Sequence, residues 1–215
     1  GLPVLFPGQG IGLAGTEVTL ASVLRGAGYR TQMIGKWHCG DQPGFLPTDH
    51  GFDHYFGLPY SNDMGRQAPM TEGPFAPPPG TEPFYLPPLP LLEDQQVIEQ
   101  QPDQAALTER YVTEAVRFLR DARDDPFFLY LAHLYVHVPL YVQERFARES
   151  TNGAYGAAVA AIDWATAAIV HELGELGLER DTVVIFTSDN GSRGVDGGSN
   201  EPLRGAKATT WEGGM

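Results

Sequence analysis

Residues 29–40 read Tyr-Arg-Thr-Gln-Met-Ile-Gly-Lys-Trp-His-Cys-Gly, and the rest of the chain is interpreted around them. The run from Tyr29 to Ile34 predicts a β-strand, and the segment from Gly35 to Gly40 predicts a glycine-bounded turn directly after it. In α/β proteins, ligand-contacting groups lie where strands end, because the sheet holds them rigid beside an open crevice. The turn carries an ammonium group, Lys36, and an imidazole, His38, two residues apart. We therefore interpret it as part of a binding or catalytic site.

Lysine usage supports this interpretation. The chain has twelve arginines but only two lysines, Lys36 and Lys207, and both lie in glycine-rich segments. Surface lysine is usually replaceable by arginine, so two retained lysines in such segments indicate a need for a compact ammonium group. The alternative is that lysine occurs at both positions by chance.

Composition limits the classes of function. The 215 residues are 42% hydrophobic, which suits one sizeable core. A formal net charge of −13 argues against nucleic acid or an anionic membrane surface as a partner. The single cysteine, Cys39, excludes an internal disulfide. No uninterrupted apolar run reaches the roughly 18 residues of a membrane span, so we predict no membrane segment.

The pattern of apolar residues predicts helices and strands in alternation. Thr16 is a plausible N-cap for a helix that ends near Gly26 and places six apolar residues on one face, namely Val18, Leu20, Ala21, Val23, Leu24 and Ala27. The other predicted elements are strands at 29–34, 53–56, 127–132 and 182–186, and helices at 105–123 and 155–176. Prolines between 69 and 102 are so dense that we predict an irregular insert there. This order predicts an α/β fold with a mainly parallel sheet flanked by helices.

Three predicted strands end in polar clusters. Lys36 and His38 follow the first strand, His133 and His137 follow the strand at 127–132, and Asp189 and Asn190 follow the strand at 182–186. Because parallel strands end at one edge of a sheet, we expect these clusters to converge.

The converging groups suggest hydrolysis of a sulfate or phosphate ester. Asp189 and Asn190 offer hard oxygen donors suited to calcium or magnesium, although Asp-Asn-Gly also forms ordinary turns. Lysine ammonium groups can stabilise charge on a tetrahedral anion. His38 and His137 could transfer protons or hold a leaving oxygen, or they could be structural histidines. No nucleophile is evident, since nothing around Cys39 indicates an activated thiolate beyond the neighbouring histidine.

Six ordered motifs resemble one known family. They are Gly35-Lys36-Trp37-His38-Cys39-Gly40, Gly51-Phe52-Asp53, Pro59-Tyr60-Ser61-Asn62-Asp63-Met64, Pro126-Phe127-Phe128-Leu129-Tyr130, Thr187-Ser188-Asp189-Asn190-Gly191 and Leu203-Arg204-Gly205-Ala206-Lys207 with Thr209-Thr210-Trp211-Glu212-Gly213-Gly214. The chain resembles type I sulfatases of the arylsulfatase A-like group over nearly its whole length except the proline-rich insert. The resemblance implies an alkaline-phosphatase-like α/β fold and hydrolysis of a sulfate monoester.

The resemblance also implies roles for individual residues. Asp189 and Asn190 match calcium ligands of the family, with magnesium less favoured. His38 matches a residue beside the nucleophile that assists release of sulfate from the covalent intermediate. Four side chains match contacts to the sulfate group: Lys36, Ser61, His137 and Lys207.

The sequence departs from the family pattern at the nucleophile. The family uses a formylglycine made from the first residue of Cys/Ser-x-Pro-x-Arg, whereas Cys39 is followed by Gly-Asp-Gln-Pro. We therefore expect residues 1–215 to be an incomplete part of the large N-terminal sulfatase domain, with the formylglycine and the C-terminal domain elsewhere in the parent protein. On this hypothesis the isolated chain is inactive, and the parent is secreted, periplasmic or lysosomal.

Two other functions stay open from sequence. A phosphodiesterase or phosphonate hydrolase of the same superfamily could share the sheet and much of the site. A non-catalytic relative could keep the fold as a binding module. If the parent is a sulfatase, its substrate could be a small-molecule or sugar sulfate ester, and we expect the insert at 69–102 to influence that choice.

Overall fold

The computed structural model describes residues 4–65 and 87–215. The chain divides into two compact units, Gly1–Pro139 and Leu140–Met215, which are described separately.

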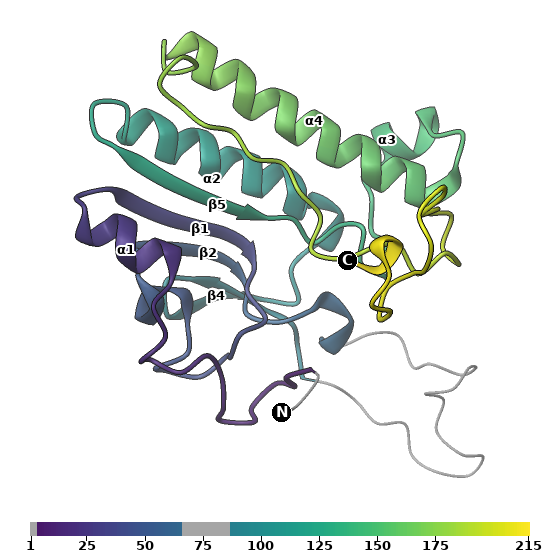
Figure 1. The fold of residues 1–215 in the computed structure, drawn as a ribbon, viewed down its shortest axis with the longest axis horizontal. Coiled ribbons are helices and arrows are strands. Elements are labelled where there is room, and N and C mark those ends of the chain that lie inside the picture. Colours follow the sequence, from purple (N-terminus) through teal and green to yellow (C-terminus); the bar gives the residue numbers. More distant parts are fainter. Residues whose placement is uncertain (1–3, 66–86) are drawn as a thin grey trace. The chain divides into compact units, whose positions relative to one another are not determined.

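The first unit is built on a five-stranded mixed sheet (Figure 1). The strands are β1 (Arg30–Lys36), β2 (His54–Leu58), β3 (Pro90–Glu93), β4 (Gln96–Gln100) and β5 (Phe127–Ala132), in the order β4-β3-β2-β1-β5. β1 lies between β2 and β5 and is parallel to both, while β3 and β4 add an antiparallel hairpin beside β2. The predicted α/β class is confirmed, and the three predicted strands of this unit are present with small shifts of their ends.

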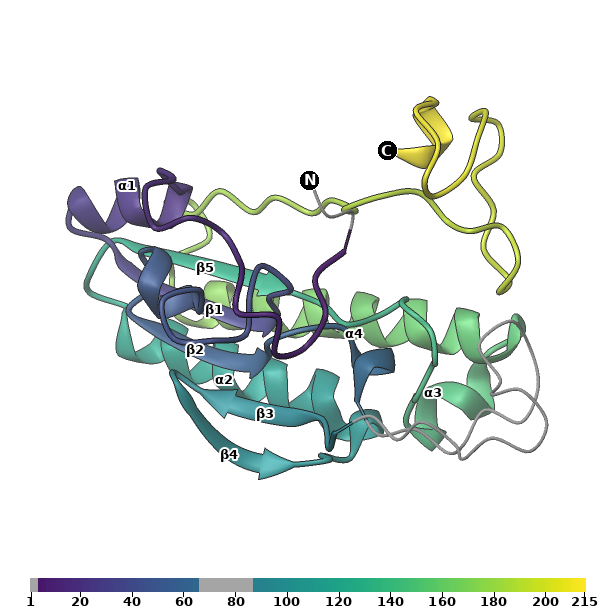
Figure 2. The same ribbon diagram turned by 90° about the horizontal axis from the view of Figure 1, so that it is seen from below.

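Helices cover both faces of this sheet. Figure 2 shows α1 (Leu20–Gly26) on one face and α2 (Leu107–Asp121) on the other. Successive strand residues point to opposite faces, so Tyr55 joins a core cluster with Ala21 of α1, whereas Phe56 packs edge-on against Tyr111 of α2. α2 confirms the helix predicted at 105–123 and buries one apolar side, formed by Leu107, Tyr111, Ala115, Phe118 and Leu119. Three short 3-10 turns complete the unit: Pro47–His50, Asn62–Met64 and Gln104–Ala106.

Two predictions for the first helix were wrong. Its N-cap is Thr19, whose hydroxyl accepts from the Ser22 N–H in a capping box, so the helix begins later than Thr16 suggested. The predicted apolar face is also mostly exposed, since Val18, Leu20 and Val23 are 80%, 62% and 54% accessible, whereas Ala21 is 2% accessible. The helix packs on β1 through Ala21, whose small side chain buries little apolar surface.

The proline-rich region contains more regular structure than predicted. Residues 66–86 lie outside the described residues, so the expectation of an irregular insert is open there. β3 and β4 contradict that expectation for the remainder, because they pair as a hairpin with Glu93 opposite Gln96. No proline follows Pro90 until Pro102, and Pro90 is the first residue of β3, where a missing N–H is tolerated.

β5 is less buried than its apolar sequence predicted. It is the last strand in the sheet order and pairs only with β1 among the described strands. Its side chains are mostly half-buried, and Tyr130 is 48% exposed. The apolar run therefore predicted the strand correctly, while its position at the sheet edge leaves it partly uncovered.

The second unit has two helices and a long irregular segment. α3 (Glu144–Glu149) was not predicted from sequence, whereas α4 (Gly153–Glu175) confirms the predicted helix near 155–176. The predicted strand at 182–186 is not formed, and Val183, Ile185 and Phe186 are 85%, 81% and 69% exposed. An apolar run becomes a strand only when a neighbouring strand supplies its hydrogen bonds, and no described strand pairs with this one. The last element is a 3-10 turn at Glu212–Gly214.

By length and composition alone, α4 is long and apolar enough to cross a membrane, the one such helix among the described residues. The expectation of no membrane segment, drawn from uninterrupted apolar runs, therefore stays a prediction. Core helices of soluble proteins have the same length and composition, so the feature by itself identifies no membrane segment.

Gly35 provides a test of how tightly the centre of the sheet is packed. Its φ is +107°, and an added Cβ would lie 1.9 Å from the carbonyl oxygen of Ala132 in β5. We expect Gly35→Ala to lower the free energy of unfolding by about 2–4 kcal/mol, measured by urea denaturation. Gly26→Ala is the control, because the added Cβ meets nothing within 4 Å. A loss for Gly35→Ala no larger than that of the control would contradict this packing.

Candidate functional site

The three parallel strands end side by side. Gly35 of β1 is in register with Gly57 of β2 and with Ala132 of β5, and Lys36 is opposite Leu58. The segments that follow these strands therefore begin at one edge of the sheet. This confirms the expected convergence for the cluster after β1 and the cluster after β5. It also corrects one detail, since Gly35 and Lys36 belong to β1 and the turn begins at Trp37.

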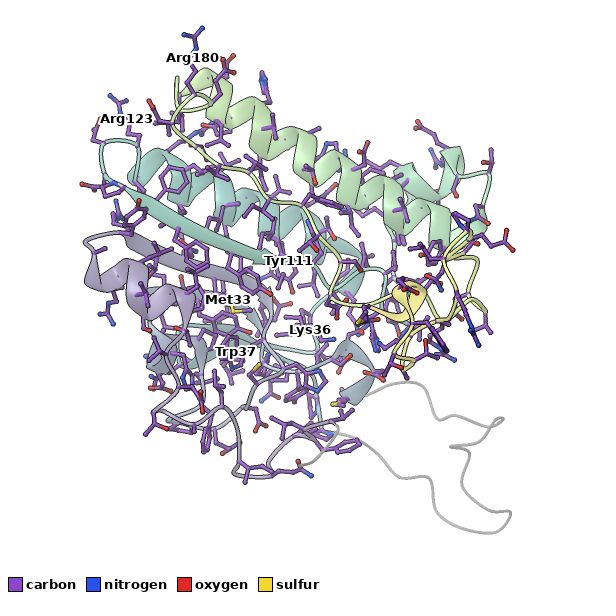
Figure 3. The ribbon with its side chains drawn as sticks, in the orientation of Figure 1. Met33, Lys36, Trp37, Tyr111, Arg123 and Arg180 are labelled. Carbon is purple, nitrogen blue, oxygen red and sulfur yellow. The ribbon has the colours of Figure 1, made fainter. Side chains whose placement is uncertain are left out.

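Trp37 anchors the turn that carries the predicted site residues. Its backbone N–H donates to the Leu58 carbonyl at 3.0 Å, and the His38 N–H donates to the Pro59 carbonyl at 3.0 Å. The Trp37 indole N–H donates to the Phe45 carbonyl at 2.7 Å. Figure 3 shows Lys36 and Trp37 together at the end of β1. These three hydrogen bonds fix the backbone position from which the Lys36 side chain extends.

Ser61 and His137 are brought together from the segments after β2 and β5. Ser61 Oγ lies 3.3 Å from His137 Nδ1, which is 2.7 Å from the Val138 carbonyl oxygen. A carbonyl only accepts, so Nδ1 carries a hydrogen, and in a neutral ring the lone pair lies on Nε2. Two residues 76 positions apart therefore form one polar pair at the edge where Lys36 also ends its strand.

His38 has a backbone partner from the N-terminal loop. Its φ is +60°, and Nε2 lies 3.0 Å from the carbonyl oxygen of Leu5, so Nε2 carries a hydrogen. The ring lines a small hollow with Leu5, Phe6, Gly40, Asp41, Pro59 and Tyr60. Burial and the Asp41 carboxylate raise the pKa of Tyr60 to about 12, so its phenol stays protonated at neutral pH.

Cys39 is a weak nucleophile in this structure. Its thiol is half-buried, and that burial raises its pKa. A thiol needs the opposite shift to be reactive near neutral pH. This supports the prediction that Cys39 is not the nucleophile.

The second unit brings the Asp189-Asn190 turn next to the segment of Lys207. The Lys207 backbone N–H donates to the Ser192 carbonyl at 3.0 Å. Gly191 approaches Gly213 so closely that an added Cβ would lie 1.8 Å from the Gly213 carbonyl oxygen. The turn carrying the predicted metal ligands and the loop carrying the second lysine are thus neighbours.

Asn200 joins these two segments and was missed by sequence reasoning. Its amide oxygen accepts from the Ser192 N–H at 2.7 Å, and its amide nitrogen donates to the carbonyls of Ser192 and Gly205 at 2.8 and 3.3 Å. An isolated asparagine in a glycine-rich stretch usually indicates a turn, so no sequence pattern pointed to these hydrogen bonds.

The described donor set suits a hard cation but is incomplete. Among residues 4–65 and 87–215, no group of three or more His, Cys, Asp or Glu side chains could hold a metal ion. Asp189 and Asn190 supply oxygen donors of the type calcium prefers, whereas calcium takes six to eight oxygens. The chemistry of the two donors fits, and further ligands are needed.

His133, which directly follows β5, is a half-buried neutral histidine whose Nδ1 atom is fully buried. Its Nδ1 has no hydrogen-bond partner among the described residues. Burial lowers the pKa of His133 to about 4, because the cationic ring would lose its hydration. Its position in the polar cluster after β5 therefore does not make it an acid or base near neutral pH.

Comparisons with known proteins agree with these motifs. The model of the Sulfatase family matches residues 3–215. Among similar proteins, human arylsulfatase A is 41% identical over 99% of this chain and 43% of its own length. N-acetylgalactosamine-6-sulfatase of Rattus norvegicus is 37% identical over 95% of the chain and 39% of its own length. The chain thus spans less than half the length of these relatives.

Solved structures share the fold. The crystal structure of Ps i-CgsB in complex with k-i-k-neocarrahexaose has a TM-score of 0.80 and 28% identity, covering 98% of this chain and 48% of that one. PsFucS1 sulfatase from Pseudoalteromonas sp. has a TM-score of 0.77 and 29% identity, covering 92% of this chain and 43% of that one.

The buried state of His133 predicts a pH dependence of stability. The ring is neutral when folded, with a pKa of about 4, and titrates near 6.5 when unfolded. Stability from this group is therefore complete above pH 6.5 and is lost as the pH falls toward 4. We expect the free energy of unfolding, from urea titrations at pH 7.5 and 5.0, to fall by about 2 kcal/mol more in the unmodified protein than in His133→Phe. His171→Asn, at an exposed histidine of α4, is the control, and an equal fall in all three proteins would contradict the prediction.

Proposed function

The chain belongs to the sulfatase family, and we propose that the whole protein hydrolyses a sulfate monoester at the sheet edge where β1, β2 and β5 end. The observation that carries the proposal is the Ser61–His137 pair, 3.3 Å apart, at the edge where Lys36 ends β1. These are three of the side chains that the sequence motifs assigned to the sulfate group.

Each of the three side chains has a distinct task in this proposal. Lys36 supplies a positive charge beside the anionic sulfate group of the ester, which is needed because the chain as a whole carries a net charge of −13. Ser61 offers a hydroxyl donor to a sulfate oxygen. His137 orients its ring by the Nδ1–H donated to the Val138 carbonyl, so that Nε2 is the atom that faces a ligand or exchanges a proton.

The remaining assignments concern the second unit and His38. We propose that Asp189 and Asn190 are two of the ligands of a calcium ion, in preference to magnesium, and that Lys207 is a second sulfate contact. When bound, calcium would hold and polarise the sulfate oxygens, and the family's formylglycine would supply the attacking oxygen. His38, whose Nε2 donates to Leu5, would be the proton-transferring group nearest that nucleophile.

A sulfated sugar is the substrate class that we favour. One similar protein is an N-acetylgalactosamine-6-sulfatase, and one structural relative was solved with a carrageenan-type hexaose. Phosphodiester or phosphonate hydrolysis, and binding without catalysis, are the alternatives that the assays below separate.

Removal of the Lys36 charge tests the sulfate site. In the whole protein with calcium present, we expect Lys36→Ala to lower kcat/KM for an aryl sulfate by about 100-fold to 1,000-fold, because one charged donor to the transition state is lost. Lys36→Arg should recover only part of this, since the bulkier guanidinium does not replace a point charge. Arg123→Ala is the control, because Arg123 is an exposed cation that precedes the amino end of β5.

The choice of ester separates the competing functions. Faster turnover of an aryl sulfate than of the matching phosphate mono- and diesters is expected. A preference for the phosphate esters would replace the proposal by the phosphodiesterase alternative. Absence of turnover on every ester, with sulfate still bound, would favour the binding module.

We also propose that residues 1–215 alone are inactive. Cys39 lacks the Pro-x-Arg context of a formylglycine precursor, burial raises the pKa of its thiol, and the described metal donors are incomplete. The isolated chain, assayed with an aryl sulfate and calcium, should give no turnover above buffer. Calcium-dependent turnover would show instead that the nucleophile lies within these residues.

A further inference from the structure

Asn62 lies buried between the segments that carry Ser61 and His137. Asn62 is only 1% exposed and lies in the 3-10 turn Asn62–Met64 that follows β2. The amide nitrogen donates to the Pro139 carbonyl at 3.0 Å, two residues beyond His137. One side chain therefore connects the residue after Ser61 with the end of the His137 segment.

The other hydrogen of this amide is fixed by Gln104. Asn62 Nδ2 donates to Gln104 Oε1 at 2.9 Å, and Gln104 is itself only 5% exposed. The Gln104 backbone carbonyl also accepts from the Tyr135 hydroxyl at 3.5 Å. Tyr135 precedes His137 by two residues, so this bond is a second link between the His137 segment and the Asn62–Gln104 pair. With both hydrogens engaged in different directions, the Asn62 amide has one orientation.

The backbone of Asn62 is held as firmly as its side chain. The Met64 N–H donates to the Ser61 carbonyl at 3.0 Å, and the Gly65 N–H donates to the Asn62 carbonyl at 3.3 Å. Ser61 therefore cannot move without moving the turn, and the turn is bonded to Pro139.

We propose that Asn62 is a positioning residue that sets the separation between Ser61 and His137 and thereby the width of the sulfate-binding site. The part that concerns sulfate rests on the proposed function. The part that concerns the Ser61–His137 separation does not, because it follows from the bond between Asn62 and Pro139.

Two variants separate positioning from general stability. Asn62→Asp keeps the size of the side chain but replaces the donor by a carboxylate, which repels the Pro139 carbonyl while a rotated Gln104 amide can still donate to it. Gln104→Leu removes the other bond and leaves Asn62 bonded to Pro139. Both disturb a buried polar pair, so both should lower the thermal midpoint by several degrees.

The structural readout is the contact between Ser61 and His137 in the whole protein with labelled histidine. We expect the nuclear Overhauser effect between the Ser61 β protons and the His137 ring to be lost in Asn62→Asp and kept in Gln104→Leu. Its retention in Asn62→Asp, or its loss in both variants, would overturn the positioning role.

The kinetic readout tests the link to sulfate. We expect kcat/KM for an aryl sulfate to fall about tenfold to a hundredfold in Asn62→Asp, and inhibition by free sulfate to weaken by a similar factor, because misplacement by about 1 Å costs this much. Gln104→Leu should stay within about threefold of the unmodified enzyme. If the unmodified protein hydrolyses no sulfate ester, the proposed function fails while the magnetic resonance result still decides the role of Asn62. Normal kinetics in Asn62→Asp with a lost Ser61–His137 contact would refute the link to sulfate alone.

Discussion

The close backbone packing at Gly35 is the constraint on which the sheet edge depends. Gly35 lies between Ala132 and Gly57 in register, and an added Cβ at Gly57 would lie 1.9 Å from the Gly35 carbonyl oxygen. This close packing aligns the ends of three parallel strands, so the loops that follow them begin side by side although they are far apart in sequence. Lys36 follows as the last residue of β1, so the chain leaves the sheet directly after the lysine.

A second constraint holds the other end of β1. The Asp53 carboxylate accepts from the Thr31 backbone N–H at 3.0 Å and the Thr31 hydroxyl at 3.1 Å, and it pairs with Arg25 at 2.8 Å. One acidic side chain after Phe52 thus joins the helix α1, the start of β1 and the segment before β2. The motif Gly51-Phe52-Asp53 is structural in this unit, while the groups available for ligand chemistry lie at the opposite end of the strands.

Local patterns in the sequence predicted most of the first unit and less of the second. Strands β1, β2 and β5 and helix α2 follow from apolar runs and a 3.6-residue period, because these elements have their hydrogen-bonding neighbours within the described chain. The run at 182–186 is also apolar, but it forms hydrogen bonds with no described strand, and it stays irregular. The exposed face of α1 shows the same limit, since periodicity predicts which residues share a face and not whether another element covers it. For the candidate site, sequence motifs selected Ser61 and His137, whereas Gln104 could be found only from the fold.

In each unit, a neutral amide side chain joins two loops, and the chemistry of an amide suits an anion site. Asn62 in the first unit joins the loop of Ser61 to the loop of His137. Asn200 in the second unit joins the loop that follows Asp189 and Asn190 to the loop of Lys207. If sulfate binds as proposed, a carboxylate in either place would repel it, and a lysine or arginine there would compete with Lys36 and Lys207 for it. An amide satisfies backbone carbonyls in the interior at no cost in charge, so loop geometry can be fixed without changing the local field. In a chain with a net charge of −13, local cations must outweigh the overall charge wherever an anion binds, and the proposed function assigns this task to the two lysines.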